Sequence, residues 1–266
     1  MITINEMIIQ NAANGMTIDE AQNYACQEII LTKISSSPLA NNILLKGGVV
    51  MFNETHNIRR TTKDLDFDFV RYDISDKSIK LFILLLNNYH PNYKVRCLKI
   101  DDLHQDDYKG KRVLVSIKDK TRELKFKMDI GVHTLLAVEQ KVSCFSFENG
   151  NNQIILRVNP PEQIVAEKLY SLAKHGALSS RFKDVFDIYY FIDKNILNRE
   201  VVKTCLNTLL LSKKYNLSSL EDICVIINNA FEDKEYIKNF NSSNEGWIDA
   251  SREVIFKVIL DYIYSL

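Results

Sequence analysis

Aspartates at alternate positions are the first sign of chemistry in this chain. The stretch KDLDFDFV carries Asp64, Asp66 and Asp68 and alternates them with apolar residues. Successive strand residues point to opposite faces, so the pattern predicts a strand over residues 63–70 with all three carboxylates on one face. Such carboxylates repel one another unless a cation lies among them, and Mg²⁺ suits the position because it binds carboxylate oxygens together with substrate phosphates. The competing interpretation is an edge strand whose charges discourage aggregation.

A fourth carboxylate and a glycine pair extend this pattern. Asp129 lies in the alternating stretch ELKFKMDIGV, which predicts another strand over residues 123–132. Two carboxylates on one strand and a third on its neighbour form the usual two-metal site for phosphoryl or nucleotidyl transfer. Gly47 and Gly48 precede a predicted helix, VVMFNE, where small residues let backbone N–H groups approach a phosphate. A tight turn would explain the glycine pair alone, but the ordered combination favours nucleotidyl transfer.

The elements that would position these residues fall into two parts. Strand and helix patterns mix up to residue 158, and from Pro160-Pro161 onward the pattern is helical throughout. We therefore predict an α+β domain with a mixed sheet over residues 1–158 and an all-helical domain over 159–266 that completes the active site. The predicted helices cover residues 18–35, 76–89, 162–174, 181–194, 199–213, 220–231, 234–239 and 247–264. The predicted strands cover 42–47 (or a helix end), 63–70, 93–100, 112–117 and 123–132, followed by a hairpin with its turn at 149–151. The stretch 239–246 is predicted to be a flexible loop.

Composition excludes several classes of protein. Lys plus Arg equals Asp plus Glu at 34 each in 266 residues, so there is no strong whole-molecule field for nucleic acid. The five cysteines are scattered without a CxxC spacing, which supports neither a zinc ribbon nor a disulfide scaffold. The first residues lack the basic region of a signal peptide, and the apolar runs are too short to span a bilayer. We expect a cytoplasmic protein with no membrane partner.

A local basic strip leads towards Asp129. Eight basic residues and two acidic ones lie between Lys109 and Lys127. Such a strip suits the phosphate backbone of an RNA, for example the acceptor end of tRNA, although a solvated basic hairpin is an equally good interpretation. The candidate RNA contacts are Lys118, Lys120, Arg122, Lys125 and Lys127.

Two blocks of the sequence resemble a known family. The stretch LKGGVVMFNETHNIRRTTKDLDFDF is similar to the signature of the AbiEii-type nucleotidyltransferases, a branch of the polymerase-beta-like superfamily. Members of that family are toxins of bacterial abortive-infection and type IV toxin–antitoxin systems. The second block, PPEQIVAEKLYSLAKHGALSSRFKDVFDIYYF, resembles the family's AEK-helix followed by R-x-KD-x-x-D. With Asp129 between the blocks, the resemblance covers residues 42–192.

The resemblance implies a polymerase-beta-like fold, a Mg²⁺ or Mn²⁺ cofactor and an NTP substrate. It implies catalytic roles for Asp64, Asp66, Asp129, Lys168 and Asp187, with the first three as metal ligands and Asp68 in support. It implies nucleotide-binding roles for Lys46, Gly47, Gly48, Lys168, Arg181, Lys183 and Asp184. The family usually has a small Thr, Ser or Ala after the glycine pair, whereas this chain has Val49.

The second block has an independent physical interpretation. Asp184 and Asp187 are three residues apart and share a helical face, and Asp187 lies in an apolar run where a carboxylate needs a partner. A structural ion pair with Lys168, Arg181 or Lys183 would provide one. The two interpretations are compatible, because an aspartate can orient the cation that binds a triphosphate.

The combined expectation is a nucleotidyltransferase toxin. It would transfer a nucleoside monophosphate from NTP to an RNA acceptor, with the 3′ end of tRNA as the first candidate, and so inhibit translation and growth. A cognate antitoxin would be its protein partner. The alternatives are transfer to the hydroxyl of a protein or small molecule, and a non-catalytic module of the same fold that binds a nucleotide or a partner.

Overall fold

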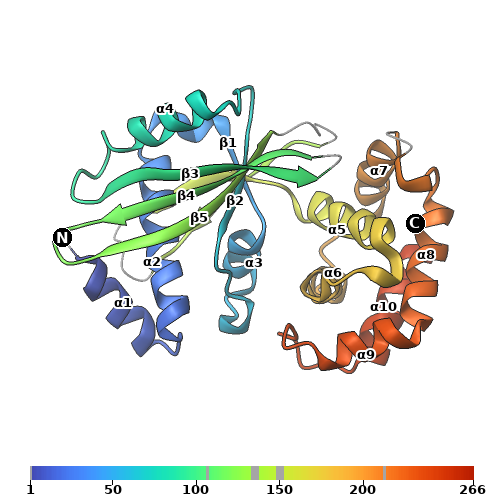
Figure 1. The fold of residues 1–266 in the computed structure, drawn as a ribbon. Helices are drawn as coiled ribbons and strands as arrows, with labels where there is room; N and C mark the ends of the chain where they lie inside the picture. The colour runs from blue at the N-terminus through green and yellow to red at the C-terminus, as the bar shows by residue number, and fades with distance from the viewer. Residues whose placement is uncertain (1, 106–107, 133–137, 148–152, 212–213) are drawn as a thin grey trace. The chain divides into compact units, whose positions relative to one another are not determined.

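The computed structural model describes residues 2–105, 108–132, 138–147, 153–211 and 214–266 (Figure 1). These residues divide into two compact units. The first comprises Met1–Thr134 and Gln140–Val158, and the second comprises Leu135–Glu139 and Asn159–Leu266. Each unit is described by itself below.

A mixed seven-stranded sheet forms the framework of the first unit, with the strand order β3-β4-β5-β2-β1-β7-β6. The strands are β1 (Ile43–Lys46), β2 (Leu65–Phe69), β3 (Lys94–Gln105), β4 (Tyr108–Lys118), β5 (Glu123–Val132), β6 (Lys141–Phe145) and β7 (Ile154–Val158). The β1–β7 and β2–β5 pairs are parallel, and the other neighbours are antiparallel. The parallel β2–β5 pair brings together two strands that lie far apart in the sequence.

Four α-helices accompany this sheet: α1 (Ile4–Ala13), α2 (Ile18–Ser35), α3 (Gly48–Thr55) and α4 (Asp76–Leu86). Capping boxes start the first two helices. The hydroxyls of Thr3 and Thr17 each accept a hydrogen bond from the backbone N–H three residues later, and the backbone N–H groups of both threonines donate to the carboxylates of Glu6 and Glu20. The ammonium of buried Lys33 on α2 donates to backbone carbonyls just after α4 and thereby ties the two helices together. Burial lowers the pKa of Lys33 to about 8.

An aromatic cluster anchors the strand that carries the aspartates. Phe67 and Phe69 are fully buried on β2, and their rings lie 5.8 Å and 5.2 Å from the ring of Phe82 on α4. β5 alternates in the same way, with buried Phe126 and Met128 on one side and exposed lysines on the other. Burying the apolar side of these strands leaves their polar side for a site.

Six α-helices build the second unit: α5 (Pro161–His175), α6 (Phe182–Asp193), α7 (Arg199–Leu210), α8 (Leu220–Glu232), α9 (Lys234–Ser242) and α10 (Arg252–Tyr264). Their core is rich in aromatic contacts. Phe240 on α9 stacks on Phe186 of α6 at 5.2 Å, and Phe231 on α8 stacks on Phe256 of α10 at 3.9 Å. No described helix in either unit is both long and apolar enough to cross a membrane.

The predicted α+β class is confirmed, and the helix at 18–35 and the strand at 123–132 have the predicted bounds. Two local predictions are wrong and one helix was missed. The last helix begins at Arg252 rather than at residue 247, because Ser251 caps it and Trp247 is drawn into the core. Residues 239–242, predicted as loop, complete α9. Helix α1 was not predicted, although Thr3 and Glu6 form its capping box. The predicted turn at 149–151 lies outside the described residues.

Replacing Phe67 with alanine should lower the free energy of unfolding by about 3–5 kcal/mol, because it opens a cavity beneath the aspartate strand. Urea denaturation followed by circular dichroism measures the loss. Leu84→Ala is the matched control, since Leu84 lies on the nearby helix α4 with 64% of its surface exposed. The control should change stability by less than about 0.5 kcal/mol. Equal losses in the two variants would contradict the anchoring role of the aromatic cluster.

Candidate active site

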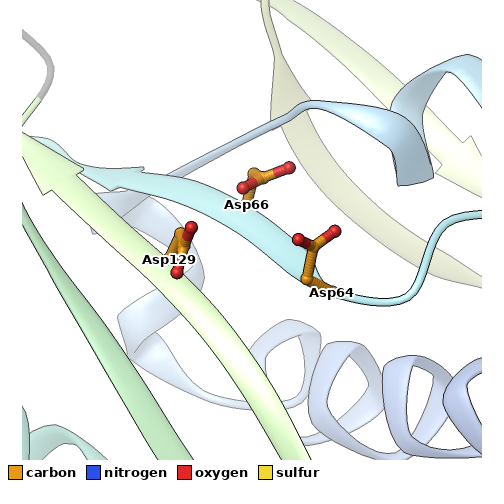
Figure 2. A group of neighbouring side chains, drawn as sticks. All are labelled: Asp64, Asp66 and Asp129. Carbon is orange, nitrogen blue, oxygen red and sulfur yellow. The ribbon is translucent and has the colours of Figure 1, made fainter. Parts of the chain in front are cut away.

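Three carboxylates converge on the polar side of β2 and β5 (Figure 2). Asp64, Asp66 and Asp129 each offer an oxygen, and these atoms lie within 4.8 Å of one another. The parallel register pairs Asp66 directly with Asp129, and Asp64 immediately precedes β2. All three residues are half-buried. We call this cluster the aspartate triad.

The triad fits a divalent cation. Ionised carboxylates only accept hydrogen bonds, so three of them at this separation repel one another without a positive charge. Their hard oxygen donors suit Mg²⁺ or Mn²⁺, which commonly retain sites for substrate phosphates. Within the described part of the chain, this is the one acidic cluster with such geometry.

Asp68 has a different environment from the triad. It is buried, and its Oδ1 lies 2.6 Å from the Nζ of Lys46 on the antiparallel strand β1. In the β1–β2 register, Lys46 lies opposite Asp66. The pair therefore places a lysine ammonium beside the aspartate strand, with Asp68 as its buried counter-ion.

The glycine pair packs directly against the aspartate strand. Gly47 has a φ of +73°, and a Cβ atom there would lie 2.1 Å from Asp66 Oδ2. A Cβ on Gly48 would lie 2.5 Å from the Cβ of Thr62. Gly48 is also the first residue of α3, where backbone N–H groups have no partner within the helix. At Gly47 the close contact with Asp66 and the positive φ both exclude a side chain, and at Gly48 the contact with Thr62 excludes one.

Two positioning contacts at Asp64 were missed by sequence reasoning. The Thr62 hydroxyl donates to Asp64 Oδ1 at 2.8 Å. The side-chain amide of Gln27 on α2 donates to the backbone carbonyls of Thr62 and Asp64 at 2.9 Å and 3.1 Å. The contact from Thr62 is local and could have been suspected, whereas nothing in the sequence relates Gln27 to a loop 35 residues away.

Arg112 on β4 is a further missed residue. Its Nε donates to Asp129 Oδ1 at 2.9 Å and its Nη2 donates to Asp129 Oδ2 at 2.6 Å. These hydrogen bonds and the charge of Asp129 raise the pKa of Arg112, and the charges of Asp64 and Asp66 add to the effect. The guanidinium thus fixes the orientation of Asp129 and offsets part of the triad's charge. The sequence could have indicated this contact from the turn between the two strands. Asp119 stabilises that turn, the turn sets the β4–β5 register, and the register places Arg112 opposite Asp129.

The predicted RNA contacts follow the same hairpin. Lys125 and Lys127 are exposed on β5, and Lys118 at the end of β4 lies 3.8 Å from Glu123. Lys120 and Arg122 lie exposed in the turn between the strands. The structure therefore places these five residues on one hairpin, at increasing distance along the chain from Asp129.

The second unit contains a separate charged cluster. Lys168 on α5 contacts Asp184 and Asp187 on α6, the latter at 2.9 Å, and Arg181 contacts the other oxygen of Asp184. Burial alone would raise the pKa of Asp184, but the charges and hydrogen bonds of Lys168 and Arg181 lower it to about 2. Four of the five predicted residues of this block therefore lie together. The fifth, Lys183, has no ion pair among the described contacts, and its backbone N–H donates to Glu245.

Trp247 completes this cluster and was not predicted as a site residue. Its Nε1 donates to Asp187 Oδ1 at 3.1 Å, and both side chains are buried. Asp187 is fully buried and accepts from Trp247 and Lys168, so its side chain is placed to orient the lysine. No sequence spacing connects a tryptophan in a loop with an aspartate sixty residues earlier.

Comparison with known proteins identifies the family. The model of the nucleotidyltransferase AbiEii toxins of type IV toxin–antitoxin systems matches residues 29–250. The chain belongs to this family. The match includes the triad, the glycine pair and the Lys168 cluster, and it makes this AbiEii-family protein a nucleotidyltransferase of a toxin family.

A solved structure shares the fold of this AbiEii-family protein. A structure from H. pylori described as a candidate nucleotidyltransferase has 14% sequence identity and a TM-score of 0.53, covering 94% of this chain and 95% of that one. JHP933 from Helicobacter pylori has 12% identity and a TM-score of 0.47, covering 94% and 93%. None of the curated proteins compared with the chain matches it in sequence.

Gly47→Ala should displace Asp66 and weaken Mn²⁺ binding at the triad, because the new Cβ cannot occupy the position of the carboxylate. Electron paramagnetic resonance of Mn²⁺ measures the affinity directly. Gly15→Ala is the matched control: Gly15 also has a positive φ, of +96°, but a Cβ there would meet only Ile58 at 3.4 Å. The control should lose about 1 kcal/mol of stability and keep its Mn²⁺ affinity. Unchanged affinity in Gly47→Ala would contradict the steric argument.

Asp184→Asn should destabilise the protein by about 3–5 kcal/mol at neutral pH, because it removes the buried carboxylate that pairs with half-buried Lys168 and with Arg181. The folded pKa of Asp184, about 2, lies below the unfolded value of 3.8. The stabilisation is therefore complete above about pH 4 and is lost as the pH falls towards 2, so the difference between wild type and variant should shrink across that window. Urea denaturation followed by the fluorescence of the single Trp247 measures it.

Asp193→Asn on the same helix is the control, since Asp193 is exposed. It should change stability by less than about 0.5 kcal/mol. A difference between wild type and Asp184→Asn that stays constant with pH would show that Asp184 does not titrate as described.

Proposed function

We propose that this AbiEii-family protein transfers a nucleoside monophosphate from NTP to a hydroxyl of RNA, with the 3′ end of tRNA as the first candidate, and that the modification stops translation and growth. The observation that carries the proposal is the aspartate triad beside the glycine pair. The family match supports the reaction class and the toxin role. The acceptor and the nucleotide belong to the proposal.

Asp64, Asp66 and Asp129 are the residues that would hold Mg²⁺ or Mn²⁺. Bound there, the metal would lower the pKa of the attacking hydroxyl and neutralise charge on the triphosphate. The hydroxyl oxygen forms a bond to the α-phosphorus, the bond from that phosphorus to the bridging oxygen breaks, and pyrophosphate leaves. Asp129 is proposed to take the hydroxyl proton. It can do so while paired with Arg112, because each carboxylate oxygen has two acceptor positions.

The triphosphate is proposed to contact Lys46, Gly47 and Gly48. Support comes from the start of α3 at the glycine pair and from the lysine ammonium beside the aspartate strand. For the second unit we propose that Lys168, oriented by Asp184 and Asp187, binds phosphate groups of the nucleotide. Arg181 and Lys183 are proposed to add positive charge, as in the family's second block.

An RNA acceptor is preferred to a protein or small-molecule hydroxyl because exposed basic residues lead along β5 to Asp129. A type IV toxin–antitoxin family also suggests an antitoxin as protein partner. We propose a cytoplasmic site of action, where both tRNA and NTP are present.

Replacing Asp66 with asparagine should reduce label transfer from α-³²P-NTP to background, because the triad loses one of its metal-binding charges. Incubation with each NTP and total RNA, followed by gel electrophoresis and sequencing of RNA 3′ ends, identifies the nucleotide and the acceptor. Asp19→Asn, at an exposed aspartate on α2, should retain transfer.

Two outcomes would overturn parts of this proposal. Intact transfer by Asp66→Asn would exclude the triad as the reaction centre. Label recovered in protein or small molecules instead of RNA would replace the proposed acceptor while leaving the reaction class in place. Calorimetry with Mg²⁺–NTP tests the partner-binding form of the non-catalytic alternative, because a module without a nucleotide site would release no binding heat. A nucleotide-binding but inactive module would release heat and transfer no label.

A further inference from the structure

One side of the β3–β4–β5 ribbon is strongly basic. The register aligns Lys99 with Leu114 and Lys127 across the three strands, and Arg96 with Ser116 and Lys125 in the next row. Residues that pair across a sheet share one side of it, so these rows form a continuous surface. We call this surface the basic face: Lys94, Arg96, Lys99, Lys118, Lys125 and Lys127.

The opposite side of the ribbon is part of the core. Val95 on β3, Val113 and Val115 on β4, and Phe126 on β5 are all buried. The basic face is therefore the side of the ribbon that the core leaves uncovered, and its six basic residues are exposed. Because the strands are held by the core on their other side, the backbone positions that carry the charges are fixed relative to one another.

Few acidic groups offset this charge. Lys99 pairs with Asp101 at 2.9 Å, and Lys118 lies 3.8 Å from Glu123. The hydrogen bond from Ser116 and the charges of Lys118, Arg96 and Lys125 lower the pKa of Glu123, so this carboxylate offsets part of the charge at one end of the face. Lys125 and Lys127 are exposed, and neither has a carboxylate within salt-bridge distance among the described residues. In a chain with equal numbers of basic and acidic residues, such segregation of charge argues against an ordinary solvated surface.

The basic face runs directly into the aspartate triad. Lys127 and Lys125 lie two and four residues before Asp129 on the same side of β5. Alternate residues of a strand are about 6.7 Å apart, so Lys127 lies one such spacing from Asp129 and Lys125 lies two.

An apolar side chain also lies on the basic face. Leu98, 48% exposed, lies between Arg96 and Lys99 in the sequence, where an apolar group can contact a ribose or base.

We propose that the basic face binds the phosphates of a single-stranded 3′ segment of the acceptor RNA and directs its terminal hydroxyl towards Asp129. The inference rests on the proposed function for the identity of the strand as acceptor. Charge complementarity and continuity with the triad favour a nucleic acid strand, which carries one phosphate per residue and can track a row of lysines. An extended strand is favoured over a duplex because the terminal hydroxyl must reach half-buried carboxylates.

Equilibrium binding without NTP tests the surface separately from catalysis. The probe is a short, fluorescein-labelled, single-stranded RNA, and its anisotropy is measured with the full-length protein over a range of salt concentrations. In Lys125→Gln/Lys127→Gln the slope of log affinity against log salt should become shallower by about 0.7 for each lysine, because each phosphate contact to a single strand releases counterions.

Lys77→Gln/Lys80→Gln is the matched control, since it removes the same charge from exposed positions on α4. The control should keep the wild-type slope. Thermal unfolding and Mn²⁺ binding should be unchanged in both double variants, which excludes misfolding or damage to the triad. Equal slopes in the two double variants would overturn the proposal.

The direction of the strand has its own test. An RNA with a photoreactive 4-thiouridine at its 3′ end should cross-link to peptides containing β5, and cross-links confined to the second unit would overturn the proposal.

Competition with polyglutamate tests whether the ligand is a nucleic acid. Displacement of the RNA by polyglutamate at equal charge concentration would also overturn the proposal, because the surface would then suit an acidic protein. RNA that binds through Lys125 and Lys127 but never receives label would support this surface while refuting the proposed acceptor reaction.

Discussion

Repulsion among three carboxylates is the constraint on which the site depends. Asp64, Asp66 and Asp129 are held with carboxylate oxygens within 4.8 Å of one another, a distance at which like charges repel. The core holds strand β2, and with it two of these aspartates, in place, because aromatic side chains on the other face of β2 are buried against α4. The free energy of core burial therefore holds together charges that would otherwise separate.

Neighbouring groups reduce the cost of this arrangement in distinct ways. Arg112 supplies a positive charge and two hydrogen bonds to Asp129, and Thr62 donates to Asp64. Asp66 has Gly47 against it, so the absence of a side chain there makes space for its carboxylate. One side of the triad thus has a cation, another a hydroxyl, and the third a backbone without a side chain.

The charged cluster of the second unit is arranged differently, because its carboxylates are already paired with cationic side chains. Half-buried Lys168 lies between two buried carboxylates, and Trp247 supplies a further donor to Asp187. A lysine held in this way keeps its charge and orientation at little further entropic cost, which suits a phosphate ligand. The two clusters share a principle: a buried apolar layer positions charged groups whose other partners would come from substrate.

Local patterns in the sequence determined the fold class, most helices and strands, and the candidate residues of both clusters. Alternation over 63–70 and 123–132 follows from strand geometry, and the glycine pair and the lysine–aspartate block follow from their spacing and family resemblance. The family resemblance had already separated Asp68 from the three proposed ligands; tertiary structure supplied the contacts, since Asp68 pairs with Lys46 and Asp129 joins from a distant strand. It also decided the roles of Gln27, Arg112 and Trp247. The physical reason is that strand register and core packing bring together groups tens of residues apart, which no local periodicity encodes.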